Sequence, residues 1–151
     1  MFLKKYFALF LFLLLFFACK QEQKENNQTI PAKDGNSKQI QRFGMVTVLK
    51  REKREYYKQL HAAVWPAVQK KINECNIKSY SIYLKEVDGK LLLFSYFEYT
   101  GNNFDADMKK MAADSATQRW WKETDPCQQP LPDAAAKKQI WSSMEEVFHQ
   151  N

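Results

Sequence analysis

The sequence predicts an α+β domain with a ferredoxin-like antiparallel sheet, in the order strand, helix, strand, strand, helix, strand. Two apolar runs of strand length flank an Asp-Gly pair, which is the strongest short signal for a β-hairpin. Segments of helical periodicity stand on either side of that hairpin. This βαββαβ order places both helices on one face of the sheet. The opposite face is left uncovered, so we expect a two-fold dimer that packs two such faces together.

The first strand and the first helix form the N-terminal half of the predicted domain. Residues 42–49 are a short apolar run rich in β-branched side chains, typical of a buried strand. The charged residues 50–53 lead into a helix that we expect to reach about Glu74. Pro66 interrupts its apolar periodicity and must kink or restart the helix, because proline lacks an N–H and clashes with the preceding turn.

The central hairpin joins residues 77–86 to residues 91–99 through Asp88-Gly89. The first of these strands alternates, with Tyr80, Ile82 and Leu84 on one face. The second is nearly all apolar, as expected of a central strand covered on both faces.

The second half of the domain begins where Asn103 offers an N-cap to a helix that starts at Phe104. Asp114 can cap a further helical segment. Residues 124–132 contain three prolines, which predict a loop without regular strand pairing. Residues 141–148 alternate well enough to be the last strand of the sheet.

The N-terminus is typical of a bacterial lipoprotein. In residues 1–18 a short basic region precedes an apolar run of about a dozen residues, as in a secretion signal. Ala18 directly before Cys19 resembles a lipobox, which predicts cleavage before Cys19 and lipidation of its thiol; a plain signal anchor with an incidental cysteine is the alternative. Residues 19–40 are almost without apolar side chains and predict a disordered tether. We expect a membrane-anchored protein in the periplasm or on the cell surface, with residues 41–151 as its folded domain.

Charge and cysteine content narrow the classes of function. The formal net charge is +6, but the charges of the folded part are interspersed, which argues against a nucleic-acid-binding protein. Cys75 and Cys127 would lie in an oxidising compartment where a disulfide is permitted. Neither has a CxxC partner or a nearby histidine, so we expect free, buried thiols and no metal site.

Candidate chemistry centres on His61, whose imidazole titrates near neutral pH. Tyr57 and Trp65 lie four residues to either side, so a continuous helix would align the three rings. A histidine of this kind is also a common structural residue. The sequence lacks the GxSxG motif, the P-loop and the Rossmann glycine pattern, and His61 has no partner at metal-ligand spacing.

Aromatic side chains suggest the kind of ligand. Trp120 and Trp121 would point about 100° apart on a helix, so that one packs in the core and the other overhangs a cleft. Tyr80 adds a phenol, and Gln118 and Arg119 lie next to the tryptophans in sequence. Indole and phenol groups suit a polar ring with an apolar face, such as a sugar. A tryptophan pair that serves only the core is the alternative.

The sequence resembles the L-rhamnose mutarotase family from about Arg42 to the C-terminus. The resemblance rests on Tyr57-x-x-x-His61 with Val64-Trp65-Pro66, residues 79–84, Gln118-Arg119-Trp120-Trp121 and residues 144–149, in this order. It implies a dimeric α/β barrel and an isomerase that interconverts the anomers of L-rhamnose or a related 6-deoxy sugar, without metal or organic cofactor. His61 would be the proton donor, and the sugar would be bound by Tyr57, Tyr80, Trp120 and Trp121.

Two features differ from the family pattern. Ala62-Ala63 stands where the family can have Asn-Pro, and the loop 127–132 is also similar to fucose-type mutarotases.

The expected mechanism is acid/base-assisted opening of the pyranose ring, in which His61 protonates the ring oxygen and Tyr57 or a bound water handles the other proton. Two other functions remain open: a non-catalytic, lipid-anchored sugar-binding module, and an oxygenase on the same dimeric barrel, the latter by analogy of fold alone.

Overall fold

A computed structural model of the protein describes residues 40–150. The predicted signal peptide, the predicted lipidation site Cys19 and residues 20–39 of the predicted tether lie outside the described residues. No helix in residues 40–150 is long and apolar enough to cross a membrane. The elements are β1 (Gln41–Leu49), a 3₁₀ turn η1 (Arg51–Lys53), α1 (Arg54–Ala62), α2 (Pro66–Glu74), β2 (Ile77–Val87), β3 (Lys90–Tyr99), α3 (Phe104–Ala112), α4 (Ser115–Thr124), η2 (Asp125–Cys127), β4 (Gln128–Gln129), α5 (Pro132–Ala136) and β5 (Ser142–Met144).

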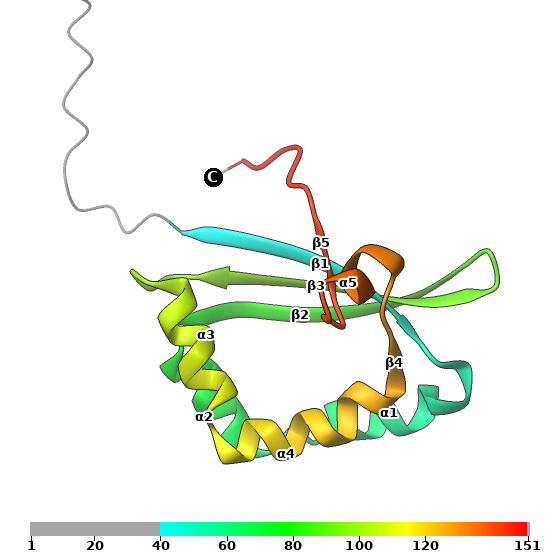
Figure 1. Ribbon diagram of the computed structural model, residues 1–151, viewed down its shortest axis with the longest axis horizontal. Coiled ribbons are helices and arrows are strands. Elements are labelled where there is room, and N and C mark those ends of the chain that lie inside the picture. The colour runs from blue at the N-terminus through cyan, green and yellow to red at the C-terminus, as the bar shows by residue number, and fades with distance from the viewer. Residues whose placement is uncertain (1–39, 151) are drawn as a thin grey trace, which may run out of the picture. The chain divides into compact units, whose positions relative to one another are not determined.

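The sheet is antiparallel, with strand order β2-β3-β1-β4 and with β5 also paired to β1. Helices α1 to α4 lie on one side of it (Figure 1). The predicted α+β fold class is therefore confirmed, including the antiparallel hairpin of β2 and β3. Asp88 and Gly89 both have positive φ, as a two-residue hairpin turn requires.

The last strand is shorter than predicted. Only Ser142–Met144 pair with β1, opposite Gly44–Val46, and the chain from 145 to 150 has no regular secondary structure. The other end of the same β1 edge pairs with β4, through Val48 and Leu49. The proline-rich stretch is thus not all loop, because Gln128–Gln129 lie between its prolines and can still pair. Two short strands share the edge that one long strand was expected to fill.

The first predicted helix is two helices. Helix α1 ends at Ala62, and α2 begins with Pro66 at its first position, where the missing N–H of proline would have no partner in any case. The helix therefore restarts at Pro66, one of the two outcomes expected there. Trp65 lies in the break, so it does not continue the helical row of Tyr57 and His61.

Alternate residues of the sheet face the helices and form the core. On β3 these residues are Leu91, Leu93, Ser95, Phe97 and Tyr99, all at most 5% exposed. The residues between them on β3 are only half-buried, and Tyr83 of β2 is 64% exposed. The sheet thus has one covered face and one partly open apolar face. The thiols of Cys75 and Cys127 are free and buried in two separate clusters of the covered side.

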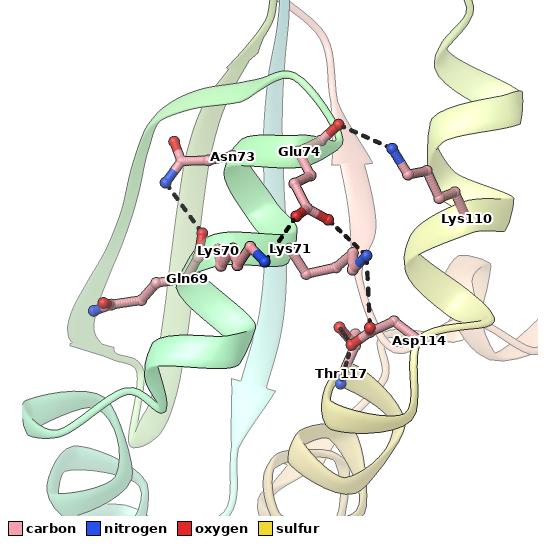
Figure 2. A network of polar contacts seen from close by, with 8 residues as sticks. All are labelled: Gln69, Lys70, Lys71, Asn73, Glu74, Lys110, Asp114 and Thr117. Carbon is pink, nitrogen blue, oxygen red and sulfur yellow. Dashed lines mark hydrogen bonds and ion pairs between the residues drawn. The ribbon is translucent and has the colours of Figure 1, made fainter.

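A polar network fixes α2 against α3 and α4 (Figure 2). The Lys71 Nζ atom lies 2.7 Å from the Glu74 carboxylate and 3.6 Å from that of Asp114. Asp114 also caps α4 by accepting bonds from the backbone N–H and the hydroxyl of Thr117, which confirms the predicted cap. Lys110 of α3 donates to the backbone carbonyl of Glu74. These contacts set the spacing of the helices that face the sheet.

Candidate functional site

A hollow of about 630 Å³ lies between the sheet and the helices, and we call it the inner hollow. Its walls come from β1, β2 and β3 on one side and from α1 to α4 on the other. The segment 139–143 and the start of the proline-rich stretch 124–132 add further residues to its wall. The five residues predicted as the site all line it: Tyr57, His61, Tyr80, Trp120 and Trp121. The fold therefore gathers side chains from three separate parts of the sequence.

A β-bulge places Tyr80 in this hollow. Ile77 pairs with Tyr99 and Ser81 with Tyr96, so Ser79 and Tyr80 together oppose Phe97 alone. Ser79 is in the left-handed conformation, with φ of +51°, as the extra residue of a bulge can be. The bulge lets both Ile77 and Tyr80 face the helices, although an even strand would send them to opposite faces. The Tyr80 ring then meets Phe97 edge to face, with centroids 5.6 Å apart.

His61 is held in one tautomer. Its Nδ1 atom lies 2.9 Å from the backbone carbonyl oxygen of Tyr57. A carbonyl oxygen only accepts hydrogen bonds, so Nδ1 carries the proton and donates it to this bond. In the neutral ring, Nε2 therefore has a free lone pair. Burial lowers the pKa of His61 below the ordinary histidine value, and the bond to Tyr57 opposes this shift only in part. The neutral ring is the main form at pH 7.

Aromatic rings surround the His61 imidazole. The Tyr57 ring stacks on it with centroids 4.1 Å apart and an interplanar angle of 29°. Trp120 meets it edge-on at 5.3 Å, and Trp65 meets Trp120 in the same way at 5.3 Å. Trp65 thus supports the site through Trp120 rather than by lining the hollow. This packing leaves the imidazole little freedom to rotate away from the Tyr57 carbonyl.

The two adjacent tryptophans have different surroundings, as their helical spacing predicts. Trp120 is 7% exposed and packs with Val68 and Ala116. Trp121 is 37% exposed and still lines the inner hollow. One indole is therefore part of the core, and the other presents a face to the hollow and to solvent. Gln118 and Arg119 line neither this hollow nor its neighbour described below, and Gln118 instead donates to the Ala112 carbonyl.

The two phenols of the site are neutral at physiological pH. Burial raises the pKa of Tyr57, and the nearby Tyr80 phenol adds to this effect. Burial raises the pKa of Tyr80 to about 12, although 42% of the residue's surface is exposed. Neutral phenols are hydrogen-bond donors and weak acids, so both can offer a proton to an oxygen in the hollow.

Several polar residues line the hollow without having been indicated by the sequence, and two of them, Asp125 and Gln128, bear on its chemistry. Asp125 supplies the hollow's single carboxylate among the described residues, and partial burial raises its pKa. Gln128 is 5% exposed; its Nε2 donates to the Thr124 carbonyl, and its Oε1 has no partner within residues 40–150. Both lie in the proline-rich stretch 124–132, for which the sequence predicts only a loop. Their one signal is the presence of polar side chains directly after the tryptophan helix.

This arrangement suits proton transfer on a polar ring compound. It combines an imidazole with a free lone pair, neutral phenols, a carboxylate and a partly exposed indole face. In residues 40–150 no three histidine, cysteine, aspartate or glutamate side chains are grouped to hold a metal ion. A sugar ring could lie on the indole face. Its hydroxyl groups could then bond to the imidazole nitrogen, the phenol oxygens and the carboxylate oxygens.

Comparison with known proteins identifies the family of the chain. Residues 42–150 match the family model described as L-rhamnose mutarotase. An L-rhamnose mutarotase of Bacillus subtilis (strain 168) is 29% identical over 110 residues, which cover 73% of this chain and 98% of that protein. One of Oceanobacillus iheyensis is 26% identical and covers 74% of this chain and 100% of its own length. The crystal structure of L-rhamnose mutarotase FA22100 from Formosa agariphila has the same fold, with a TM-score of 0.55, 21% identity and coverage of 74% and 99%. The chain belongs to the L-rhamnose mutarotase family.

Proposed function

We propose that this protein is an isomerase that interconverts the α and β anomers of L-rhamnose, or of a closely related 6-deoxy sugar. The observation that carries this proposal is the fixed tautomer of His61, which turns the free Nε2 lone pair into a base inside a hollow lined by aromatic rings. Family membership supports the type of reaction. The combination of one exposed indole face with several hydrogen-bonding groups supports a monosaccharide ring as substrate.

His61 is the central acid/base group of the proposed mechanism, but its role differs from the expected protonation of the ring oxygen. With Nδ1 bonded to the Tyr57 carbonyl, Nε2 of the neutral ring can only accept a proton. Its Nε2 accepts the proton of the anomeric hydroxyl, while the C1=O1 double bond forms and the bond from C1 to the ring oxygen breaks. The imidazolium that results is then the proton donor when the ring closes, because it returns its proton to O1. A positioned acid/base group of this kind contributes about 10²–10⁴-fold to the rate. The neutral ring thus accepts first and donates second.

The second proton transfer takes place at the ring oxygen. As the ring opens, this oxygen takes a proton from the Tyr57 phenol or from a bound water, and it gives the proton back on closure. Between the two steps the C1–C2 bond rotates, so that closure occurs on the opposite face of the carbonyl. Tyr80 and Trp121 hold the rest of the sugar, while Trp120 lines the same hollow from its place in the core. Trp121 suits contact with the apolar face of the ring, because its indole is the more exposed of the pair.

The direct test is saturation-transfer NMR on the two anomeric protons of L-rhamnose. We expect the folded domain to accelerate exchange, and the variant His61→Asn to lose most of the acceleration. Lys58→Ala is a matched control, because Lys58 lies on the same helix and is exposed. Binding of rhamnose without faster exchange would contradict the proposal and favour the sugar-binding module. A haem-dependent absorption spectrum would favour the oxygenase.

The partly open face of the sheet supports a second proposal, that the protein is a homodimer. Half-buried Phe94 and Leu92 and the 64% exposed Tyr83 lie on this face. In the C-terminal segment, Val147 and Phe148 are 88% and 78% exposed. A second copy that packs against this face would form the dimeric α/β barrel and cover the apolar side chains. Sedimentation should give a dimer, and Phe94→Asp should shift it towards monomer. A wild-type monomer at micromolar concentration would contradict this proposal.

The sequence of the first 19 residues supports a third proposal, attachment to a bacterial membrane through lipidated Cys19. It also supports a location in the periplasm or on the cell surface, where extracellular saccharides are available. The test is metabolic labelling with a radioactive fatty acid, followed by detergent phase separation. Wild-type protein should carry label and enter the detergent phase. Cys19→Ala should do neither, and label on that variant would contradict the proposal.

A further inference from the structure

A second hollow of about 590 Å³ adjoins the inner one, and we call it the outer hollow. The two share His61, Tyr80 and Trp120, together with apolar residues of α2 and β2. Pockets of about 300–1,000 Å³ hold drug-sized ligands, so either hollow alone is large enough for a sugar ring. A single monosaccharide beside His61 would leave the part of the outer hollow lined by Gln69, Asn73 and Lys78 without ligand.

Polar side chains line the far part of the outer hollow. Gln69 and Asn73 come from α2, and Lys78 and Ser79 come from the bulged end of β2. Figure 2 shows Gln69 and Asn73 on the side of α2 away from Lys71, outside the network that ties α2 to the other helices. The nearer walls are apolar, with Val64 and other residues of the helix layer. Amide, hydroxyl and ammonium groups over an apolar floor suit a second sugar ring.

Lys78 gives this hollow a positive charge. Its Nζ atom donates to the Asn73 Oδ1 atom at 3.1 Å, and no carboxylate of residues 40–150 lies within ion-pair distance of it. Glu98 is directly across the sheet, but its carboxylate accepts bonds from Ser79 and Tyr96. The bond to Asn73 turns the ammonium group towards α2, and Lys78 lines the hollow there. An anionic group on a ligand could complete its hydrogen bonding.

We infer that the site accepts a saccharide longer than one unit, with its reducing-end 6-deoxy sugar in the inner hollow and a uronic acid in the outer hollow. This inference rests on the proposed function. His61 needs a free anomeric centre, so only the reducing-end unit can lie beside it, and the second unit must be joined through a hydroxyl away from C1. The uronic carboxylate pairs with Lys78. The Gln69 amide bonds to a hydroxyl group of the second ring, and so does the second amide N–H of Asn73, since Asn73 Nδ2 already donates to the Gln69 carbonyl.

The experiment compares three sugars in the anomer-exchange assay: L-rhamnose, β-D-glucuronosyl-(1→4)-L-rhamnose and β-D-glucosyl-(1→4)-L-rhamnose. The two disaccharides differ only in the carboxylate. We expect both disaccharides to exchange faster with protein than without, and the acidic one to have a KM about three- to tenfold below that of the neutral one, as charge-assisted bonds predict. Lys78→Ala should bring the two KM values together.

Lys70→Ala is the control for a general effect of charge. Lys70 follows Gln69 on α2, but its side chain is 78% exposed and lines neither hollow. It should keep the preference for the acidic disaccharide. Acceleration of L-rhamnose exchange without acceleration for either disaccharide would overturn the inference and leave the proposed function standing. Equal KM values for the two disaccharides with wild-type protein would also overturn it. Absence of acceleration for all three sugars would overturn the proposed function itself.

Discussion

The Nδ1 atom of His61 lies 2.9 Å from the backbone carbonyl oxygen of Tyr57, one helical turn earlier in α1. This one contact determines which nitrogen of the imidazole meets a ligand and in which protonation state. The Tyr57 ring also stacks on the imidazole, so the same residue orients His61 through both its backbone and its side chain. The histidine of this site is thus positioned by its own helix, and it needs no neighbouring carboxylate for its tautomer.

The first prediction separates the two nitrogen atoms of His61. His61→Asn places an amide near the position of Nδ1, where it can still donate to the Tyr57 carbonyl, but it has nothing in place of Nε2. His61→Gln reaches towards the position of Nε2 with a group that does not titrate. Because each lacks a base in the hollow, both should lower enzyme-catalysed anomer exchange by about 10²–10⁴-fold. Circular dichroism should show that both variants fold. Activity near the wild-type level in His61→Asn would mean that Nε2 has no part in the reaction.

The second prediction concerns pH. Burial lowers the pKa of His61, so the neutral ring that accepts the anomeric proton persists to a lower pH than in an exposed histidine. The catalysed rate should therefore be constant near pH 7 and fall as the pH decreases through a midpoint below about 6.5, the ordinary histidine value. The measurement is saturation-transfer NMR between pH 5 and 8, with the enzyme-free rate subtracted at each pH. A rate that rises on acidification would identify the imidazolium as the group that acts first.

The third prediction separates the two adjacent tryptophans. Trp120 is buried against Val68 and Ala116, so Trp120→Ala should lower the free energy of unfolding by about 3–5 kcal/mol. Trp121 is partly exposed, so Trp121→Ala should change stability by less than about 1 kcal/mol. It should instead raise the KM for the sugar about two- to tenfold, since it removes an aromatic contact. Urea unfolding and the exchange assay measure the two effects. A reversal of this pattern would place Trp120, not Trp121, against the sugar.

Much of the site could be predicted because its residues carry local signals. The spacing of Tyr57 and His61 is one turn of helix, and α1 does contain both. The neighbouring tryptophans point apart as any adjacent helical residues do. Period-two alternation placed Tyr80 with Ile82 on one face of β2, and both line the inner hollow. In each case the interaction that matters lies within one element.

The parts that could not be predicted depend on contacts between distant segments. Ile77 and Tyr80 share a face only because a bulge opposite Phe97 inserts a residue, and alternation alone contains no such information. The edge of β1 is divided between β4 and β5, and this division follows from where the chain returns after α4. Gln128 reaches the hollow for the same reason. The predicted alignment of Tyr57, His61 and Trp65 is wrong at Trp65, because the helix ends before this residue and a new one restarts at Pro66.

The fourth prediction concerns Gly101, which has no role as a turn residue with positive φ but leaves room for Tyr99. A Cβ atom at position 101 would overlap the hydroxyl group of Tyr99. That hydroxyl has no room to move, because the side chain is fully buried, donates to the Asp107 carboxylate at 2.8 Å and accepts from the Asn103 N–H at 2.9 Å. Gly101→Ala should therefore cost about 1–3 kcal/mol in the free energy of unfolding.

The mechanism of this cost can be tested with a double-mutant cycle. Tyr99→Phe alone should also destabilise the protein, by about 1–3 kcal/mol, because it leaves buried partners without their hydrogen bonds. The new Cβ meets the Tyr99 hydroxyl and also the ring atom Cζ that carries it. The double variant removes only the overlap with the hydroxyl, so the two single losses should sum to slightly more than the measured effect. Urea unfolding of the four proteins measures the coupling. Strictly additive losses would show that the Tyr99 hydroxyl is not the group for which Gly101 leaves room. A measured loss smaller than the sum would show that Gly101 leaves room for the Tyr99 hydroxyl. That hydroxyl anchors the start of α3, the helix whose Phe104 and Met108 line the inner hollow.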